Sequence, residues 1–342
     1  MVEALRRERI LVTGAGGSIG SALALRLAGI EPRRLVLLES SESALFALQS
    51  ALADAGLQQA PQCVLGSVAD AGLLDEVFAD YEPTVVFHAA AFKHVPLLEE
   101  HPLAAVKNNV FGTKAVVLAA SAHGARVVLL STDKAVEPAS VMGVTKRVAE
   151  MIVLDASGTV LRLGNVLASS NSVAESFAHH IAAGGPLTVT DPAARRYFLT
   201  IEEAVDLLIA AGTKHEQPIL LAPDLRSPQF ITDLARFMAR ALVPEREISI
   251  EFTKPRPGDK ELERLWSSGE TTVPAAAQGL LSICAPLKNR VALDRGLDAL
   301  QRAMLTRDLP APIACLLSLV PDFTPSAFVL NLAQKSTSRV AR

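Results

Sequence analysis

The chain has 342 residues, of which half are hydrophobic and 4% aromatic, and its formal net charge is −3. This length is sufficient for one large domain or two joined domains with a sizeable core. With no basic surplus, the sequence argues against nucleic acid or an anionic membrane surface as a partner. Three cysteines lie far apart without CxxC spacing, which argues against a disulfide framework or a zinc site, so no metal is expected.

Neither end of the chain predicts membrane insertion. The first ten residues carry charge and lack the apolar core of a signal peptide. No run reaches the about 18 apolar residues that a membrane span needs. The segment 313–332 comes closest, but Pro321, Asp322 and Pro325 interrupt it. We therefore expect a C-terminal docking segment and a cytoplasmic protein without a membrane span.

Short apolar runs alternate with longer amphipathic stretches through the first two thirds of the chain. Runs this apolar, without polar alternation, are typical of strands buried on both faces. The alternation predicts an α/β fold: a doubly wound, parallel Rossmann sheet with right-handed crossovers. The predicted strands span 10–14, 35–39, 63–67, 85–90, 126–131, 159–166 and 218–223, and the predicted helices span 18–28, 41–55, 71–80, 102–123 and 142–156.

Beyond Val166 this pattern loosens, because Pro and Gly become frequent and the apolar runs become shorter. Residues 200–223 are expected to return to the main sheet. The sequence therefore predicts a dinucleotide-binding Rossmann domain over 1–166 and 200–223. A smaller part that binds the substrate is expected over 167–199 and 224–342.

The stretch TGAGGSIG (13–20) directly follows the first predicted strand and opens the first predicted helix. Its glycines fit the spacing G-x-x-G-x-x-G through Gly14, Gly17 and Gly20, whereas Ile19 stands where the last glycine of G-x-G-x-x-G would be. Such glycines permit a tight turn and let the backbone approach a pyrophosphate beside the free N–H groups of a helix N-terminus. In this strand–helix context the stretch predicts a dinucleotide site.

A carboxylate at the end of the second strand favours NAD as the dinucleotide. Glu39 can hydrogen-bond the adenosine ribose diol and repel a 2′-phosphate, although an exposed strand-end Glu is the alternative reading. After the third strand, Ser67 and Val68 are placed to touch the adenine, and the small residues 89–91 let the cofactor cross the sheet edge. The residues expected to bind NAD are Gly14, Gly16, Gly17, Ser18, Ile19, Gly20, Glu39, Ser67, Val68, Ala89, Ala90, Ala91 and Lys146.

Three polar residues follow the fifth predicted strand at its C-terminal tip. Thr132, Asp133 and Lys134 come directly after Ser131, on the side of a parallel sheet where ligands bind. A hydroxyl, a carboxyl and an amine beside a nicotinamide site are costly to bury without a use. The alternative is a purely structural turn, which Asp133 caps while it pairs with Lys134.

Met142 and Lys146 lie four residues apart and share one face of the next helix. Lys146 would reach the nicotinamide ribose. Sites of this layout usually place a Tyr at position 142, where a nearby lysine lowers its pKa so that it takes the substrate hydroxyl proton. Neither Tyr81 nor Tyr197 is followed by a lysine four residues later, so neither supplies this pair.

Seven blocks stand in order along the chain: TGAGGSIG (13–20), HAAAFKHVPLLE (88–99), NNVFGTK (108–114), STDKAVEPASVMGVTKRVAE (131–150), RLGNVLASSNSV (162–173), GGPLTVTDPAARRYFLTIEEAV (184–205) and KPRPGDKE (254–261). Together they resemble the extended short-chain dehydrogenase/reductase superfamily, and within it the nucleotide-sugar 4,6-dehydratases of polysaccharide biosynthesis. The branch typified by UDP-N-acetylglucosamine 4,6-dehydratases has Met where others have Tyr. By this resemblance Met142 marks a subtype rather than a lesion.

The resemblance implies that UDP-N-acetylglucosamine is converted to a UDP-4-keto-6-deoxy sugar with NAD. Lys134 matches the base that removes the C5 proton, and Asp133 matches the acid that protonates the leaving C6 hydroxyl. These roles require a neutral Lys134 and a protonated Asp133. Thr132 is expected to position the C4 hydroxyl while Asp133 accepts its proton, with Lys146 or a water relay as alternatives. The catalytic candidates are Thr132, Asp133, Lys134, Met142 and Lys146.

The resemblance also implies contacts to the UDP sugar, whose diphosphate favours arginine. Arg196 and Arg256 match family positions near the diphosphate. Lys93 and Asn165 match residues that line the sugar–nucleotide cleft. Asn109 matches a family residue near the active centre, or braces the helix backbone instead.

Superfamily members usually pair through two long helices, here 102–123 and 142–156, so a homodimer or a higher homo-oligomer is expected. Small residues such as Ala120 and Ala149 would allow close approach of the helices. Two other functions stay open. A UDP-sugar C4 epimerase would have no use for the Asp133–Lys134 pair, and a non-catalytic protein that binds NAD and a UDP sugar is favoured by Met142.

Overall fold

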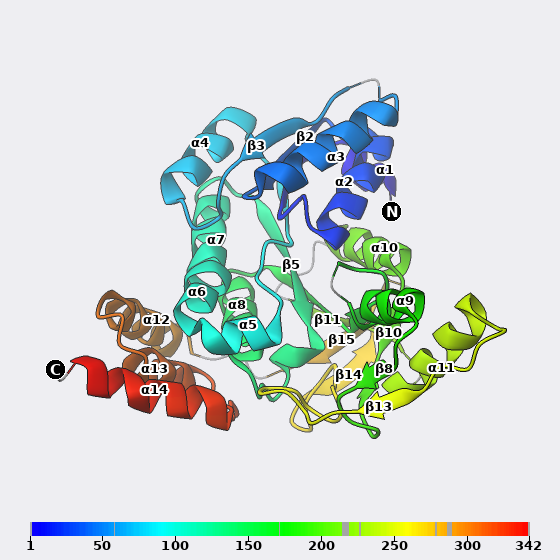
Figure 1. Ribbon diagram of the computed structural model, residues 1–342. Coiled ribbons are helices and arrows are strands. Elements are labelled where there is room, and N and C mark those ends of the chain that lie inside the picture. The colour runs from blue at the N-terminus through cyan, green and yellow to red at the C-terminus, as the bar shows by residue number, and fades with distance from the viewer. Residues whose placement is uncertain are drawn as a thin grey trace.

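The computed structural model describes residues 2–57, 59–170, 172–213, 219–225, 227–277, 279–285 and 289–340. Within these residues the centre is a nine-stranded sheet with the order β14-β15-β11-β6-β5-β4-β1-β2-β3 (Figure 1). Strands from β11 to β3 run parallel, whereas β15 and β14 at one edge run antiparallel. The strands are β1 (Arg9–Thr13), β2 (Arg34–Glu39), β3 (Gln62–Leu65), β4 (Val85–His88), β5 (Arg126–Thr132), β6 (Thr159–Leu163), β11 (Ile219–Pro223), β14 (Thr271–Pro274) and β15 (Leu280–Cys284).

The doubly wound parallel sheet predicted from the sequence is confirmed. Each predicted strand is present, with ends that differ by at most three residues. Pro218, the first residue of the last predicted strand, lies outside the described residues. The central strands β1, β4 and β6 are almost fully buried, as expected for apolar runs covered on both faces.

The sixth predicted strand, 159–166, is interrupted at Gly164. Beyond it, β7 (Asn165–Val166) leaves the main sheet and pairs with β10 (Phe198–Leu199). A Cβ atom at Gly164 would lie 2.6 Å from the carbonyl oxygen of Tyr197, so only glycine allows the two segments to meet. This departure carries the chain from the Rossmann sheet into the smaller part of the molecule.

Helices cover both faces of the sheet, and each face has its own apolar core. Leu27 of α2 and Leu208 of α10 pack on one face, while Phe78 of α4 and Val148 of α8 pack on the other. The first face carries α1 (Val2–Arg6), α2 (Ser18–Ile30), α3 (Glu42–Asp54) and α10 (Ile201–Gly212), and the second carries α4 (Ala71–Tyr81), α7 (Thr113–Ala122) and α8 (Val141–Asp155).

The smaller part has a third core of its own. Phe177 and Ile181 pack there with Ile231 and Ala235. Its elements are α9 (Val173–Ala183), β8 (Leu187–Val189), α11 (Ile231–Leu242) and β13 (Ile250–Phe252), with a two-stranded ladder of β9 (Arg195–Arg196) and β12 (Gln229–Phe230). The chain enters this part from the C-terminal end of β6 through β7, and α9 and α11 lie at the right of the molecule in Figure 1.

Two segments assigned to the smaller part lie elsewhere. The strands β14 and β15 join the edge of the main sheet. The C-terminal helices α12 (Arg290–Leu305), α13 (Pro310–Leu319) and α14 (Ala327–Val340) lie on the opposite side of the molecule from α11 (Figure 1). Their apolar side chains share the core of α8. The half-exposed edge strands lack the apolar continuity that marks a buried strand, which is why the sequence pattern missed them.

These C-terminal helices also cover part of the surface through which we expected two copies of the chain to pair. Helix α8 is buried along most of its length, and Ala149 is fully covered. Both α12 and α13 contact α8, and Lys114 of α7 lies 3.9 Å from Asp298 of α12. The chain's own C-terminal helices therefore occupy the face through which we expected a second copy to pair.

The docking role expected for 313–332 is confirmed, because Leu316, Val320 and Phe323 are buried against the core. The helix expected over 102–123 is divided into α6 (Pro102–Ala105), a π-helical segment η1 (Val106–Gly112) and α7. Such π segments are frequent at functional sites. In the described part of the chain, no helix combines the length and apolar character that a membrane crossing requires.

Candidate active site

The end of β5 forms a tightly capped polar turn. Thr132 Oγ1 accepts a hydrogen bond from the Lys134 amide at the start of the 3-10 turn η2 (Asp133–Ala135). Ser140 Oγ caps α8 by accepting from the Gly143 amide. A Cβ at Gly143 would lie 2.3 Å from the Lys134 carbonyl oxygen, so this glycine lets α8 pack directly on the turn.

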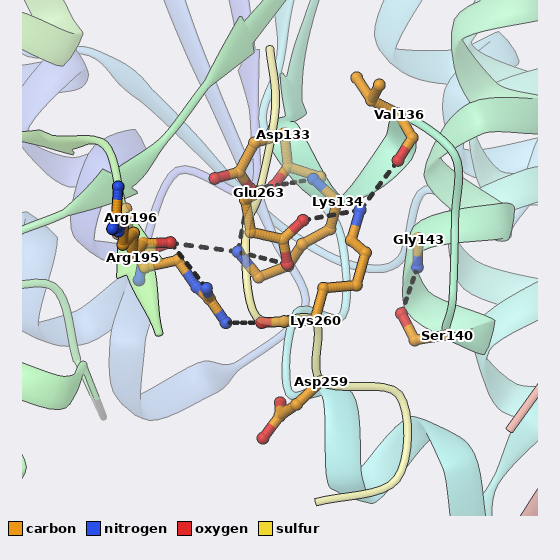
Figure 2. A network of polar contacts seen from close by, with 12 residues as sticks. Asp133, Lys134, Val136, Ser140, Gly143, Arg195, Arg196, Asp259, Lys260 and Glu263 are labelled. Atoms are coloured by element: carbon orange, nitrogen blue, oxygen red, sulfur yellow. Dashed lines mark hydrogen bonds and ion pairs between the residues drawn. The ribbon is translucent and has the colours of Figure 1, made fainter. Parts of the chain in front are cut away.

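Asp133 and Lys134 form a hydrogen-bonded ion pair at this turn (Figure 2). Asp133 is fully buried, and its Oδ1 accepts from Lys134 Nζ at 2.9 Å and from Thr132 Oγ1 at 3.0 Å. Its Oδ2 is buried without a hydrogen-bond partner. A buried carboxylate oxygen that no protein group satisfies is costly, and such atoms are typical of sites that handle protons or ligands.

The surroundings of Lys134 favour its charged form, whereas the proposed base must be a neutral amine. Its Nζ also donates to Asn165 Oδ1 at 3.1 Å and lies 3.9 Å from Glu263 Oε1. Burial would lower the pKa of Lys134, but the negative charges of Asp133 and Glu263 outweigh burial and raise that pKa. Loss of the proton from Lys134 therefore requires a change in its surroundings.

Glu263 is a site residue that the sequence did not indicate. It is 2% exposed, and its carboxylate lies between the ammonium groups of Lys134 and Lys260, with Oε2 2.7 Å from Lys260 Nζ (Figure 2). Lys260 Nζ also donates to the Val136 carbonyl oxygen at 2.9 Å. Glu263 follows the block KPRPGDKE by two residues, and a single Glu at that place carries no motif of its own.

The block KPRPGDKE is held against the start of α8, next to the polar turn, by a close backbone contact. Gly258 has φ of +81°, and a Cβ there would lie 2.7 Å from the Ser140 Cβ. Only glycine fits this conformation and this approach without strain. The contact fixes the direction in which the chain leaves toward Lys260 and Glu263.

Met142 and Lys146 occupy the buried face of α8. Met142 is 4% exposed and belongs to the core, and Lys146 Nζ donates to the Leu130 carbonyl oxygen at 2.8 Å. Burial lowers the pKa of Lys146 to about 8, although Glu150 opposes the shift. Burial raises the pKa of the Tyr197 phenol, which Arg264 opposes and the Asp133 charge reinforces.

The glycine-rich turn after β1 has the shape of a pyrophosphate cradle. A Cβ at Gly14 would lie 2.6 Å from the Ala90 backbone, and one at Gly20 would lie 2.0 Å from the Gly14 carbonyl oxygen. The N-cap of α2, Gly17, has no side chain that satisfies the first N–H groups of the helix. These observations fit a dinucleotide whose phosphates accept from that helix end.

Hydrogen bonds to the Glu39 carboxylate join this turn to the end of β2. Its Oε2 accepts from the Gly16 amide at 2.9 Å, and its Oε1 accepts from the amides of Ser40 and Ser41. A Cβ at Gly16 would lie 3.0 Å from the Glu39 side chain, so Gly16 makes room for it. The two amides use both lone pairs of Oε1, whereas Oε2 accepts only from Gly16 and retains a lone pair for a ribose hydroxyl.

The other residues assigned to the dinucleotide frame the same edge of the sheet. Ile19 packs its side chain into the core rather than toward a ligand, so it offers only its backbone. Val68 is buried against Gly112 of η1, and Ser67 Oγ accepts from the Ala69 amide. The Ala89 amide donates to the Thr13 carbonyl oxygen, which sets the path of residues 89–91 past Gly14.

Two residues that we expected near the substrate make several hydrogen bonds within the protein. Asn109 is buried, and its amide bonds both the N–H and the carbonyl of Phe92 and the Thr145 hydroxyl. Arg196 is 7% exposed and donates to three carbonyl oxygens, those of Arg195, Lys260 and Glu261. The guanidinium thus fixes the segment that carries Glu263.

Lys93 and Arg256 remain exposed. Lys93 Nζ donates to the Ser170 carbonyl oxygen at 2.8 Å, and Ser170 also bonds the Ser18 hydroxyl at the start of α2. Arg256 forms an exposed pair with Asp259, with Nε 2.9 Å from Oδ2. An exposed pair of this kind is weak, so Arg256 can exchange it for another anion.

A buried ion cluster lies behind the catalytic turn. Arg162 of β6 is fully buried and forms two hydrogen bonds to Glu150 and two to Glu270. Ser131 Oγ, next to Thr132, donates to Glu150 Oε1 at 2.6 Å. The cluster joins β5, β6, α8 and the loop before β14, so it fixes the strand end that carries the site.

The doubly wound sheet, the glycine-rich turn after β1 and the polar turn after β5 define an extended short-chain dehydrogenase/reductase fold. The family described as "Polysaccharide biosynthesis protein" matches residues 10–284, and the chain belongs to that family.

Relatives of known name agree with this family. Over 275 residues the chain is 41% identical to the probable polysaccharide biosynthesis protein EpsC of Bacillus subtilis, covering 78% of this chain but 46% of EpsC, so the chain spans about half the length of that relative. It is 32% identical to a UDP-glucose 4-epimerase of Rickettsia massiliae, over 76% of this chain and 78% of the epimerase. The solved structure of Pen from Bacillus thuringiensis is 27% identical, with a TM-score of 0.76, and the match covers 83% of this chain and 89% of Pen.

Proposed function

We propose that this chain is a nucleotide-sugar 4,6-dehydratase that converts UDP-N-acetylglucosamine to a UDP-4-keto-6-deoxy sugar with NAD, for the synthesis of a cell-surface polysaccharide. The observation that carries the proposal is the ion pair of the buried Asp133 with the partly exposed Lys134 at the C-terminal end of β5. Elimination of water across C5 and C6 needs one base and one acid beside each other, and this pair supplies both.

Each residue of the turn has a defined role in this proposal. Thr132 positions the C4 hydroxyl, and the unpartnered Oδ2 of Asp133 receives its proton. Asp133 then gives that proton to the leaving C6 hydroxyl, while Lys134 removes the C5 proton. Bound NAD would supply the hydride acceptor for C4 and the hydride donor for C6.

The cofactor is proposed to bind at the glycine-rich turn after β1. Gly14, Gly17 and Gly20 would hold the pyrophosphate at the N-terminus of α2. The carboxylate of Glu39 favours NAD over NADP, because a 2′-phosphate would meet a negative charge. Lys146 is proposed to orient the nicotinamide ribose.

The residues proposed to bind the substrate lie outside the strands of the main sheet. Arg256 is proposed to bind the diphosphate after leaving Asp259, because a guanidinium binds phosphate oxygens in pairs. Asn165 and Lys93 are proposed to line the sugar–nucleotide cleft.

The test is to incubate the protein with UDP-N-acetylglucosamine and NAD and to measure the product by mass spectrometry. We expect the loss of one water, with NMR of the sugar placing the ketone at C4 and showing whether C5 is inverted. The relationship to a protein named as a UDP-glucose 4-epimerase favours C4 epimerisation as the second candidate. An unchanged product mass with an altered C4 signal would support epimerisation, and saturable binding without any product would support a non-catalytic protein.

A further inference from the structure

Glu263 faces the ammonium group of Lys134 from outside the polar turn. Lys134 Nζ already donates to Asp133 and Asn165, and on its third side it faces Glu263 Oε1 at 3.9 Å. Glu263 is 2% exposed, and Lys260 holds the far oxygen of its carboxylate. A buried carboxylate in this position is costly unless it serves the charged groups on both sides.

The proposed reaction needs a third group that can accept a proton. The carboxylates of Asp133 and Glu263 favour the charged form of Lys134, which cannot remove a C5 proton until its own proton has left. Asp133 cannot take that proton, because it must stay available for the proton of the C4 hydroxyl. Bound sugar would also cover the side of Lys134 that faces solvent, which leaves Glu263 as the base within reach.

We propose that Glu263 is a positioning residue for the dehydration, which receives the resting proton of Lys134 and so converts that lysine into the base for C5. The proposal rests on the proposed function and deepens it. A rotation about the last bonds of the Lys134 side chain would bring Nζ within hydrogen-bond distance of Oε1. Contacts of this kind are often long without substrate and tighten in the complex.

The proton transfer from Lys134 to Glu263 needs no further reactant. An N–H bond of Lys134 breaks and an O–H bond of Glu263 forms, so a neutral amine and a carboxylic acid replace an ion pair. Lys134 then takes the C5 proton, and the electron pair of that C–H bond forms the C5–C6 double bond. The C6–O bond breaks, and the oxygen leaves as water with the proton from Asp133.

The charges around Lys134 make the internal transfer possible. Asp133 lies on its own turn, Glu263 comes from the segment after Gly258, and the positive Arg196 approaches from β9. Once Asp133 has been neutralised by the C4 proton, Glu263 is the remaining negative group beside Lys134. The positive charge of Arg196 acts to lower the pKa of Lys134, and so favours departure of its proton once Asp133 is neutral.

The experiment compares wild type with Glu263→Gln in buffered D₂O, with UDP-N-acetylglucosamine and NAD. Deuterium uptake at C5 and water loss are measured across a pH range, and C4 oxidation is followed separately from the absorbance of the reduced nicotinamide. Glu251→Gln is the matched control, because Glu251 is exposed on β13. Glu263→Asp restores a carboxylate and is expected to restore most of the exchange.

In Glu263→Gln the proton of Lys134 leaves only to solvent. We expect C5 exchange to fall about 10- to 100-fold near neutral pH and then to rise about tenfold per pH unit, while wild type stays nearly flat. C4 oxidation should be retained in the variant. Wild-type exchange with a flat pH profile, or an equal loss of C4 oxidation, would overturn the role of Glu263. Absence of water loss in wild type would instead overturn the proposed function, and this inference with it.

Discussion

Lys134 Nζ donates a 2.9 Å hydrogen bond to Asp133 Oδ1, and the other oxygen of that buried carboxylate has no partner. The two residues are adjacent in sequence, yet their side chains turn toward each other because the 3-10 turn η2 reverses the chain directly after β5. The pair therefore presents a base and an acid side by side at the ligand edge of the sheet.

Substitution of either partner is expected to stop dehydration. Lys134→Ala removes the base for C5 and Asp133→Asn removes the acid for C6, so each should lower the rate of water loss by about 100- to 10,000-fold. NAD binding, measured by calorimetry, should stay within a few-fold of wild type because neither side chain belongs to the cradle. Lys107→Ala is the control, since Lys107 is exposed on η1. Wild-type turnover in either variant would remove the acid–base roles.

The glycine-rich turn allows a matched pair of substitutions within α2. Gly20→Ala would place a Cβ 2.0 Å from the Gly14 carbonyl oxygen, so the cradle must distort and NAD affinity should fall at least about tenfold. Gly29→Ala lies in the same helix with nothing within 4 Å of the added Cβ. It should leave NAD binding unchanged and raise the free energy of unfolding by about 0.5–1 kcal/mol. Equal NAD affinity in both variants would argue against the cradle.

The sequence predicted the parts of the site that are local to strand ends. Gly14 and Asp133 directly follow strands of the parallel sheet, and Glu39 is the last residue of one. Because such strands end at one edge, their meeting could be inferred without coordinates. The hydrogen bond that the Gly16 amide donates to Glu39 is a consequence of the same geometry.

Contacts between distant segments could not be predicted in this way. Glu263 reaches Lys134 only because Gly258 packs on Ser140 and Arg196 holds the carbonyls of 260 and 261, and no periodicity records these contacts. The backbone contacts of Arg196 and the covering of α8 by C-terminal helices escape the sequence pattern for a related reason. A lone Arg or an Ala-rich helix face does not reveal whether carbonyl oxygens or C-terminal helices will cover it.

The buried cluster behind the site predicts a large stability difference between two arginine substitutions. Arg162→Met would leave Glu150 and Glu270 buried without their main cation, at a cost of about 3–5 kcal/mol in the free energy of unfolding. Arg26→Met removes an exposed pair with Asp206 and should cost less than about 1 kcal/mol. Urea unfolding of both variants measures the difference. Similar midpoints for the two would contradict a bracing role for the cluster.

His88 predicts how stability depends on pH. Thr113 Oγ1 donates to the Asn109 carbonyl oxygen, so it accepts from His88 Nε2, and the Thr13 hydroxyl donates to Nδ1 of a neutral ring. Burial, assisted by the charge of Lys146, lowers the pKa of His88 to about 3. The unfolded chain, with an ordinary pKa near 6.5, therefore binds one more proton between about pH 6.5 and pH 3, and stability is lost as the pH falls through that window.

The loss assigned to His88 amounts to about 2 kcal/mol between pH 7 and pH 5. In His88→Gln this part of the pH dependence should disappear, so the free energy of unfolding should fall by about 2 kcal/mol less than in wild type over the same interval. His101→Gln is the control, because His101 is exposed and should leave the slope unchanged. Chemical unfolding at several pH values measures the slopes, and parallel curves for wild type and His88→Gln would show that the buried ring does not set them.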